Sequence, residues 1–231
     1  MNKPAMFSRE SEMTRIVDDW LNSQGFFTKL EFVFPWGICD VVACEVNRTH
    51  VLRRIRRGQK ASIGSHSNVL LLSMIPYEGQ PIGITISDLE DTLQWSRNEL
   101  EQRIQFLRRR RFVDESPAGE FKSRVGWCPI HRRLMAIELK LKDISGALIQ
   151  ARSNQGVTRD SFVAFPESVA NRIVNGKRKR EFADSGVGVI SVNDSSCEFL
   201  LNANGPLDRI SATQELHAVE KFWTRAKQEQ Q

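Results

Sequence analysis

The sequence is poor in cysteine and has no long apolar run. Its four cysteines are scattered along 231 residues, and no leader-like segment stands ahead of them. A secreted domain held together by disulfides is therefore excluded, and the pattern predicts a reducing, cytoplasmic setting. A membrane-spanning helix needs roughly 18 or more apolar residues, and no run of that length occurs. We therefore expect no membrane partner.

Cysteine spacing also argues against a structural zinc site. Cys128 and His131 have the spacing of metal ligands, and Cys39 and Cys44 are the other available thiols. The latter two lie an odd number of residues apart in a segment that predicts a strand, so their side chains point to opposite faces. Because such a site gathers four ligands around one point, the sequence disfavours it.

Internal repeats and low-complexity tracts are missing as well. Hydrophobic residues make up 40% of the chain and charged residues 26%, which is typical of a folded globular protein and excludes a disordered one. The length suffices for one large core, or for one core with a small second domain.

Positive charge is present in a small excess that is unevenly spread. The net charge is +5, and it is concentrated in three runs, at 53–57, 108–111 and 177–180. Basic clusters on a near-neutral background favour a polyanion such as nucleic acid as the partner. The alternative is that each run is a solvated helix face.

Two outer parts of the chain alternate helices with strands. A helix is expected at 11–25, followed by strands at 26–35 and 37–46 that the turn Pro35-Trp36-Gly37 separates. After Trp127 we expect a strand at 132–142, a helix at 144–154, a strand at 160–166, a helix from Ser168 into 177–180, strands at 187–193 and 197–203, and a helix at 212–228. This alternation predicts an α/β fold whose sheet has mixed strand directions.

The middle of the chain has a different character. After a basic linker at 50–61, helices are expected at 67–75, 85–93 and 97–112, with a turn at 94–96 and a hairpin at 112–127 tipped by Pro117-Ala118-Gly119. This order resembles a winged helix-turn-helix, inserted as residues 62–126 into a discontinuous domain of residues 1–49 and 127–231. A winged domain that binds protein instead of DNA is the alternative.

The winged-helix resemblance implies a DNA-reading helix. In such domains the second helix of the motif enters the major groove. The residues near its start, where base edges are read, are Arg97, Asn98 and Gln102. Phosphate contacts are expected from Arg108, Arg109, Arg110 and Arg111, and the third basic run adds Lys177 and Arg178.

Charged residues in apolar strands give the strongest functional signal. In "IELK", Glu138 and Lys140 are two residues apart, so a strand places both on one face, while Met135, Ile137 and Leu139 form the other face. Asp40 stands early in another apolar strand. An ordinary ion pair at the rim of a sheet is the alternative for Glu138 and Lys140.

Taken with the order of elements, these residues resemble the PD-(D/E)XK nuclease superfamily, which has the restriction-endonuclease-like fold. The resemblance spans about 8–48 and 127–195 and rests on Asp40, Glu138, Lys140 and the trailing Gln150. Cys39 replaces the family's proline before the aspartate. The resemblance implies a mixed sheet flanked by helices, with the winged-helix domain inserted between its second and third strands.

The resemblance also implies a metal and a division of roles. Asp40, Glu138 and the carbonyl of Leu139 would hold Mg²⁺, with Mn²⁺ as a second candidate, because hard cations prefer oxygen ligands. Lys140 would orient the attacking water or stabilise developing charge. Gln150 would position water or phosphate, and Glu12 resembles the extra acidic residue of resolvase-like members.

The sequence therefore predicts a metal-dependent DNA endonuclease with a winged helix for DNA binding. A non-catalytic DNA-binding regulator on a nuclease-like scaffold is the alternative. A homodimer stays open, and so do the DNA structure recognised and the pathway.

Overall fold

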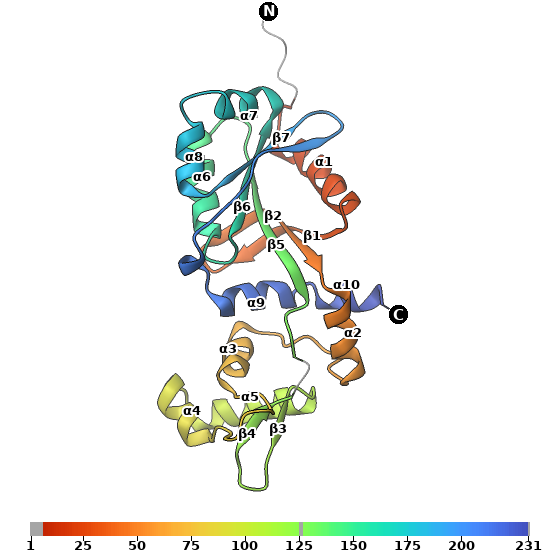
Figure 1. Ribbon diagram of the computed structural model, residues 1–231, viewed down its shortest axis with the longest axis vertical. Helices are drawn as coiled ribbons and strands as arrows, with labels where there is room; N and C mark the ends of the chain where they lie inside the picture. Colours follow the sequence, from red (N-terminus) through yellow and green to blue (C-terminus); the bar gives the residue numbers. More distant parts are fainter. Residues whose placement is uncertain (1–6, 125–126, 231) are drawn as a thin grey trace, which may run out of the picture. The chain divides into compact units, whose positions relative to one another are not determined.

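The computed structural model describes residues 7–124 and 127–230, and the chain divides into two compact units (Figure 1). Unit 1 consists of Met1–Val46 and His131–Glu215, and unit 2 of Asn47–Ile130 and Leu216–Gln231. Both units are discontinuous in sequence.

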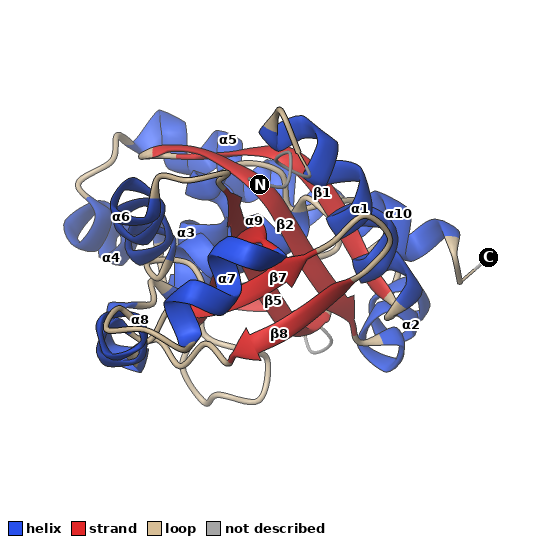
Figure 2. Ribbon diagram, turned by 90° about the horizontal axis from the view of Figure 1, so that it is seen from above, coloured by secondary structure: helices blue, strands red, loops and turns tan. Residues whose placement is uncertain are grey.

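Unit 1 is built on a six-stranded mixed sheet in the order β1-β2-β5-β6-β7-β8. The strands are β1 (Phe26–Phe34), β2 (Gly37–Val46), β5 (His131–Leu139), β6 (Asp160–Pro166), β7 (Gly188–Val192) and β8 (Cys197–Leu201). Strands β5, β6 and β7 are parallel, while the pairs β1–β2, β2–β5 and β7–β8 are antiparallel. Figure 2 shows the twist of this sheet. The predicted α/β class with mixed strand directions is confirmed.

Helices cover both faces of the sheet, because its strands alternate apolar residues between two cores. The helices of unit 1 are α1 (Glu10–Ser23), α6 (Ile144–Asn154), α7 (Glu167–Val174), α8 (Lys179–Ser185) and a 3₁₀ turn, η1 (Leu207–Arg209). Met135, Ile137 and Leu139, which were predicted to share one face, pack with α1, whereas Val163 and Phe165 pack with α6, α7 and α8. Figure 1 shows these two helical layers on opposite sides of the sheet.

Unit 2 is mainly helical with a short hairpin. Its elements are α2 (Arg48–Arg56), α3 (His66–Met74), α4 (Ile86–Leu93), α5 (Arg97–Arg109), β3 (Val113–Glu115), β4 (Phe121–Ser123) and α10 (Trp223–Gln228), and α9 (Ala212–Glu220) runs from unit 1 into it. Ser65, Thr85 and Ser96 cap α3, α4 and α5, which explains where each helix begins.

The expected hairpin is present, and a third segment joins it. Strands β3 and β4 pair antiparallel, and Ile84 forms a further antiparallel bridge to Phe121. The last part of the predicted hairpin, at 125–126, lies outside the described residues.

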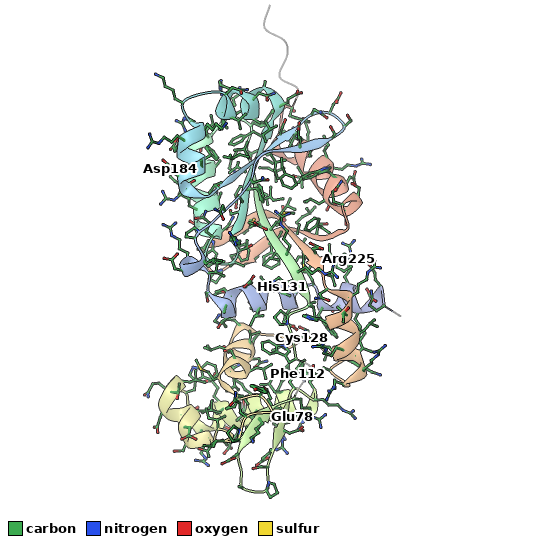
Figure 3. The ribbon with its side chains drawn as sticks, in the orientation of Figure 1. Glu78, Phe112, Cys128, His131, Asp184 and Arg225 are labelled. Carbon is green, nitrogen blue, oxygen red and sulfur yellow. The ribbon has the colours of Figure 1, made fainter. Side chains whose placement is uncertain are left out.

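The predicted linker at 50–61, expected to be helical or extended, is helical in its first half, where it belongs to α2, but it is not a free linker. Arg54 is fully buried there in an ion pair with Glu220. The guanidinium carbon of Arg54 lies 4.0 Å from the ring centre of Trp223 and 5.3 Å from that of Phe112, which Figure 3 labels. A buried charge is tolerated only beside its partner. Residues 47–61 and 216–231 therefore belong to unit 2, where the prediction had assigned 127–231 to the other domain.

Several predicted elements are shorter in the structure. The helix expected from Ser168 through the basic run is two helices, α7 and α8, and the closing helix is likewise split into α9 and α10. Strand β5 ends at Leu139 and helix α5 at Arg109, and Arg111 follows with a left-handed φ of 63°. Within 7–124 and 127–230, no helix is long and apolar enough to cross a membrane.

Candidate active site

Asp40 and Glu138 come together where the ladder between β2 and β5 stops. Val41 pairs with Ile137, which is the last pair of the ladder in that direction. Beyond it, Oδ2 of Asp40 accepts a hydrogen bond from the backbone N–H of Leu139 at 2.7 Å. The aspartate therefore satisfies an amide of the neighbouring strand and is fixed beside Glu138, as the sequence predicted.

Glu138 is a buried carboxylate with a defined partner. It is 2% exposed, and its Oε1 accepts a hydrogen bond from Nδ2 of Asn154 at 2.7 Å. Burial raises the pKa of Glu138, and the nearby charge of Asp40 acts in the same direction, while the Asn154 hydrogen bond and Lys140 lower it. Burial and Asp40 thus disfavour the ionised form of Glu138, and the Asn154 hydrogen bond and Lys140 favour it.

Lys140 joins the group from just past the end of β5. Its Nζ lies 3.4 Å from Oε2 of Glu10 and 3.9 Å from Oδ2 of Asp40. The other oxygen of Glu10 accepts from the backbone N–H of Leu141 at 3.4 Å. Lys140 therefore bridges the first turn of α1 and the second strand of the sheet, rather than pairing with Glu138.

The structure places a different acid in the site from the one predicted. Glu12 accepts hydrogen bonds from the backbone N–H and the hydroxyl of Ser8, at 2.8 and 2.6 Å, which lower its pKa. The residue of α1 that reaches Lys140 is Glu10. Both acids lie in the first turn of α1, so composition alone could not choose between them.

A similar replacement occurs on α6. Gln150 is exposed, whereas Asn154, one turn later, is 3% exposed and bonded to Glu138. The predicted helix is present, but its residue that contacts Glu138 is Asn154 and not Gln150. The two residues are four apart and therefore lie one turn from each other along the helix. The sequence did offer one signal for Asn154, because it is a polar amide at the end of a helix whose other buried residues are apolar.

The oxygens of this site suit a hard cation. Asp40 and Glu138 each have one oxygen engaged in a hydrogen bond, Oδ2 and Oε1 respectively. Over the part of the chain that the structure describes, no group of three or more His, Cys, Asp or Glu side chains is arranged to hold a metal. Mg²⁺ commonly takes one or two carboxylates and completes its shell with water and phosphate, which is the number of carboxylates that Asp40 and Glu138 supply.

The zinc alternative gains no support. His131, at the start of β5 in Figure 3, has its Nε2 3.1 Å from Oε1 of Glu215.

The predicted DNA-reading residues lie on or beside α5. The side chains of Asn98 and Gln102 are exposed and hydrogen-bonded to each other at 3.2 Å, and Arg97 lies 3.2 Å from Glu101. Arg108 pairs with Glu115, whereas the guanidinium carbon of Arg110 lies 3.6 Å from the ring centre of Phe106.

The remaining basic candidates are also at the surface. Arg109 and Arg111 are exposed, and so are Lys177 and Arg178 in the segment between α7 and α8. Nη1 of Arg178 donates to the Ser145 hydroxyl at 3.0 Å, which ties this segment to the start of α6.

Comparison with known proteins identifies no family. No protein-family model matches the chain, and no curated protein matches it. Among solved structures, the "SPO1766 protein of unknown function" from Silicibacter pomeroyi is similar at 12% identity with a TM-score of 0.42, over 100% of this chain and 92% of that one.

Proposed function

We propose that the protein is a metal-dependent DNA endonuclease that uses unit 2 to bind DNA. The observation that carries this proposal is the meeting of Asp40, Glu138 and Lys140 at one end of the ladder between β2 and β5, with Glu10 behind the lysine. Two carboxylates and an ammonium group are what hydrolysis of a phosphodiester requires beside a hard cation.

In this proposal the residues of the site have different roles in hydrolysis. Asp40 and Glu138 would hold Mg²⁺, with the Leu139 carbonyl as a further oxygen. When bound, the ion would neutralise phosphate charge and acidify a water molecule. Lys140 donates a hydrogen bond and positive charge to the phosphate as charge develops there, and Glu10 holds the lysine in place. Gln150, being exposed, is assigned to contact with the substrate rather than to proton transfer.

For unit 2 we propose a winged-helix function. Its order of α3, bridge, α4, α5, β3 and β4 matches the expected arrangement, with the capped turn at 94–96 between α4 and α5. Helix α5 buries Leu100, Ile104 and Leu107 and leaves its polar side exposed. That side carries Asn98 and Gln102, the amides suited to reading base edges.

Cleavage of DNA tests the proposal directly. The full chain is incubated with branched, linear and plasmid DNA, with Mg²⁺, Mn²⁺, Ca²⁺ or chelator. We expect cleavage with Mg²⁺ or Mn²⁺ and none in chelator, and loss of cleavage in Asp40→Ala and Glu138→Ala. Activity that survives in chelator, or in either variant, contradicts the assignment.

A non-catalytic DNA-binding regulator is the second candidate. This alternative is favoured because the charged groups of the site already have partners within the protein. Lys140 pairs with both Glu10 and Asp40, and Asp40 also accepts a hydrogen bond from a backbone amide. Tight DNA binding by the full chain, with no cleavage of any DNA under any metal, would establish this alternative.

A further inference from the structure

Asn154 is a buried amide with a partner on each side. Its Nδ2 donates to Oε1 of Glu138 at 2.7 Å, and its Oδ1 accepts from the indole Nε1 of Trp36 at 3.3 Å. The same Nδ2 lies 3.6 Å from Sγ of Cys39. Three segments that are distant in sequence, the β1–β2 turn, β5 and the end of α6, therefore meet at one side chain.

The chemistry of the indole decides which way this amide points. An indole N–H can only donate a hydrogen bond. The atom of Asn154 that faces Trp36 must therefore be its oxygen, which leaves the NH₂ group to face Glu138. A donor aimed at Oε1 fixes that oxygen as the acceptor and directs the other carboxylate oxygen away from Asn154.

Trp36 is itself held in place although its side chain reaches the surface. Its ring is stacked on Phe34, with centroids 5.3 Å apart and planes inclined by 21°. On another side it lies over Gly156, where an added Cβ would be only 3.4 Å from the indole. Trp36 is nevertheless 42% exposed, on the turn that joins the strand carrying Asp40 to its neighbour.

We propose that Trp36 and Asn154 form a positioning relay that sets the orientation of the Glu138 carboxylate for metal binding. The relay rests on the proposed function, because it concerns Glu138 as a metal ligand. Neither relay residue touches the metal or the reacting atoms. Second-layer hydrogen bonds of this kind orient ligands and typically change metal affinity by about 10–100-fold when they are removed.

The experiment measures Mg²⁺ binding to the full chain by isothermal titration, and DNA cleavage as a function of Mg²⁺ concentration. Asn154→Leu removes the donor to Glu138 while keeping a branched side chain, and we expect Mg²⁺ affinity to fall by roughly 10–100-fold. Trp36→Phe keeps an aromatic ring beside Phe34 but removes the indole N–H together with one of the two fused rings, so the amide loses its donor and is free to turn over. A smaller loss, roughly three- to tenfold, is expected there, since one hydrogen bond of about 1 kcal/mol is lost.

The double variant distinguishes a relay from two separate effects. If Trp36 acts only through Asn154, the double variant should bind Mg²⁺ no more weakly than Asn154→Leu alone. Controls of the same kind are Ser153→Ala, at an exposed neighbour on α6, and Trp20→Phe, at a tryptophan whose ring contacts Phe199 at a tilted angle. Both controls should bind Mg²⁺ as the unaltered chain does.

Each result has one meaning. Unchanged Mg²⁺ affinity in both single variants, or additive losses in the double variant, overturns the relay while leaving the nuclease assignment intact. An unaltered chain that binds no Mg²⁺ and cuts no DNA overturns both proposals. Should Asn154→Leu melt at a lower temperature than the unaltered chain, the surface variant Trp36→Phe decides the matter.

Discussion

The residues at the end of the β2–β5 ladder are expected to have different roles that mutation can separate, and Lys140 is the clearest case. Its ammonium group contacts two carboxylates but supplies no metal-binding oxygen. Lys140→Ala should therefore leave Mg²⁺ and DNA binding nearly intact while cleavage falls by roughly a hundredfold or more, the scale of losing one charge-stabilising donor. Steady-state cleavage rates at varied DNA concentration would check this. A rise in KM with an unchanged kcat would instead assign Lys140 to substrate binding.

Glu10 and Glu12 give a second test at the same scale. Glu10→Gln removes the charge that holds Lys140, so we expect slower cleavage with little change in melting temperature, because exposed ion pairs contribute about 0–1 kcal/mol to stability. Glu12→Gln should cut DNA at the normal rate, since Glu12 bonds to Ser8 of its own turn. A loss of cleavage in the Glu12 variant alone would restore the residue that the sequence had favoured.

A third residue-scale prediction concerns pH. Burial, followed by the positive charges of Lys221 and His66, lowers the pKa of His217 from its usual 6.5, and Glu220 opposes this shift. The unfolded chain then binds more protons at mildly acid pH than the folded chain does. The stability that neutral His217 contributes is present above about pH 6.5 and is lost as the pH falls toward the folded pKa.

Urea unfolding between about pH 7.5 and 5.5 would measure this effect. We expect the midpoint to fall with pH in the unaltered chain and to fall less in His217→Gln. His66 faces His217 at 5.7 Å between ring centres, so His66→Gln should lessen the fall as well. Parallel pH profiles for all three proteins would show that neither imidazole causes it.

At the scale of elements, helix α5 and the turn after it carry the charge that we assign to DNA binding. Changing Arg108, Arg109, Arg110 and Arg111 to glutamine should weaken binding to every DNA sequence and flatten its dependence on salt, because fewer counterions are released. Arg108 is already paired with Glu115, so Arg109 and Arg111 should account for most of the change. Fluorescence anisotropy at several salt concentrations measures both quantities, and an unchanged slope would remove α5 from the interface.

The elements were largely predictable, because their signals are local. Alternation of apolar residues marked β2 and β5, and the spacing of Glu138 and Lys140 identified the candidate site. What failed depends on contacts distant in sequence. The pairing of Asn154 with Trp36 joins α6 to the β1–β2 turn, and no local pattern encodes it.

The same reasoning explains the misassigned basic segment. The run at 53–57 has the composition of a solvated face, yet Arg54 is buried against an acid 166 residues further along the chain. Only the folded chain shows which arginine of the run has a partner. Domain limits drawn from composition were therefore displaced at both ends of unit 2.

At the scale of the whole molecule, Arg54 and Glu220 tie the two sequence segments of unit 2 together. Arg54→Met leaves the Glu220 carboxylate buried without its counter-charge, and breaking a buried pair in this way costs about 3–5 kcal/mol. Urea unfolding followed by tryptophan fluorescence, with exposed Arg56→Met as the matched control, measures the loss. A difference below about 1 kcal/mol between the two variants would show that the pair is dispensable.

The limits of the units lead to a last prediction. Joining residues 1–46 to 131–215 should give a chain that melts cooperatively, because this piece contains the whole six-stranded sheet and both of its helical layers. Removing only 62–126 should give a less stable protein, since Leu216 would lose the core that it shares with α3 and α5, and Arg54 of α2 would lose its contact with Phe112. Circular dichroism of the two proteins, with thermal melts, compares them. If the two shortened proteins were equally stable, the domain limits expected from composition, with 62–126 as the insert, would be the correct ones.

The interleaving of the two units has a consequence for biosynthesis. As the chain leaves the ribosome, β2 must wait for β5 with one edge unpaired while all of 47–130 is made. Unit 2 in turn is incomplete until Glu220 and Trp223 have been synthesised. The nascent chain therefore exposes an unpaired strand edge, prone to aggregation, until residues 47–130 have been synthesised. This makes it a candidate for chaperone binding at that stage.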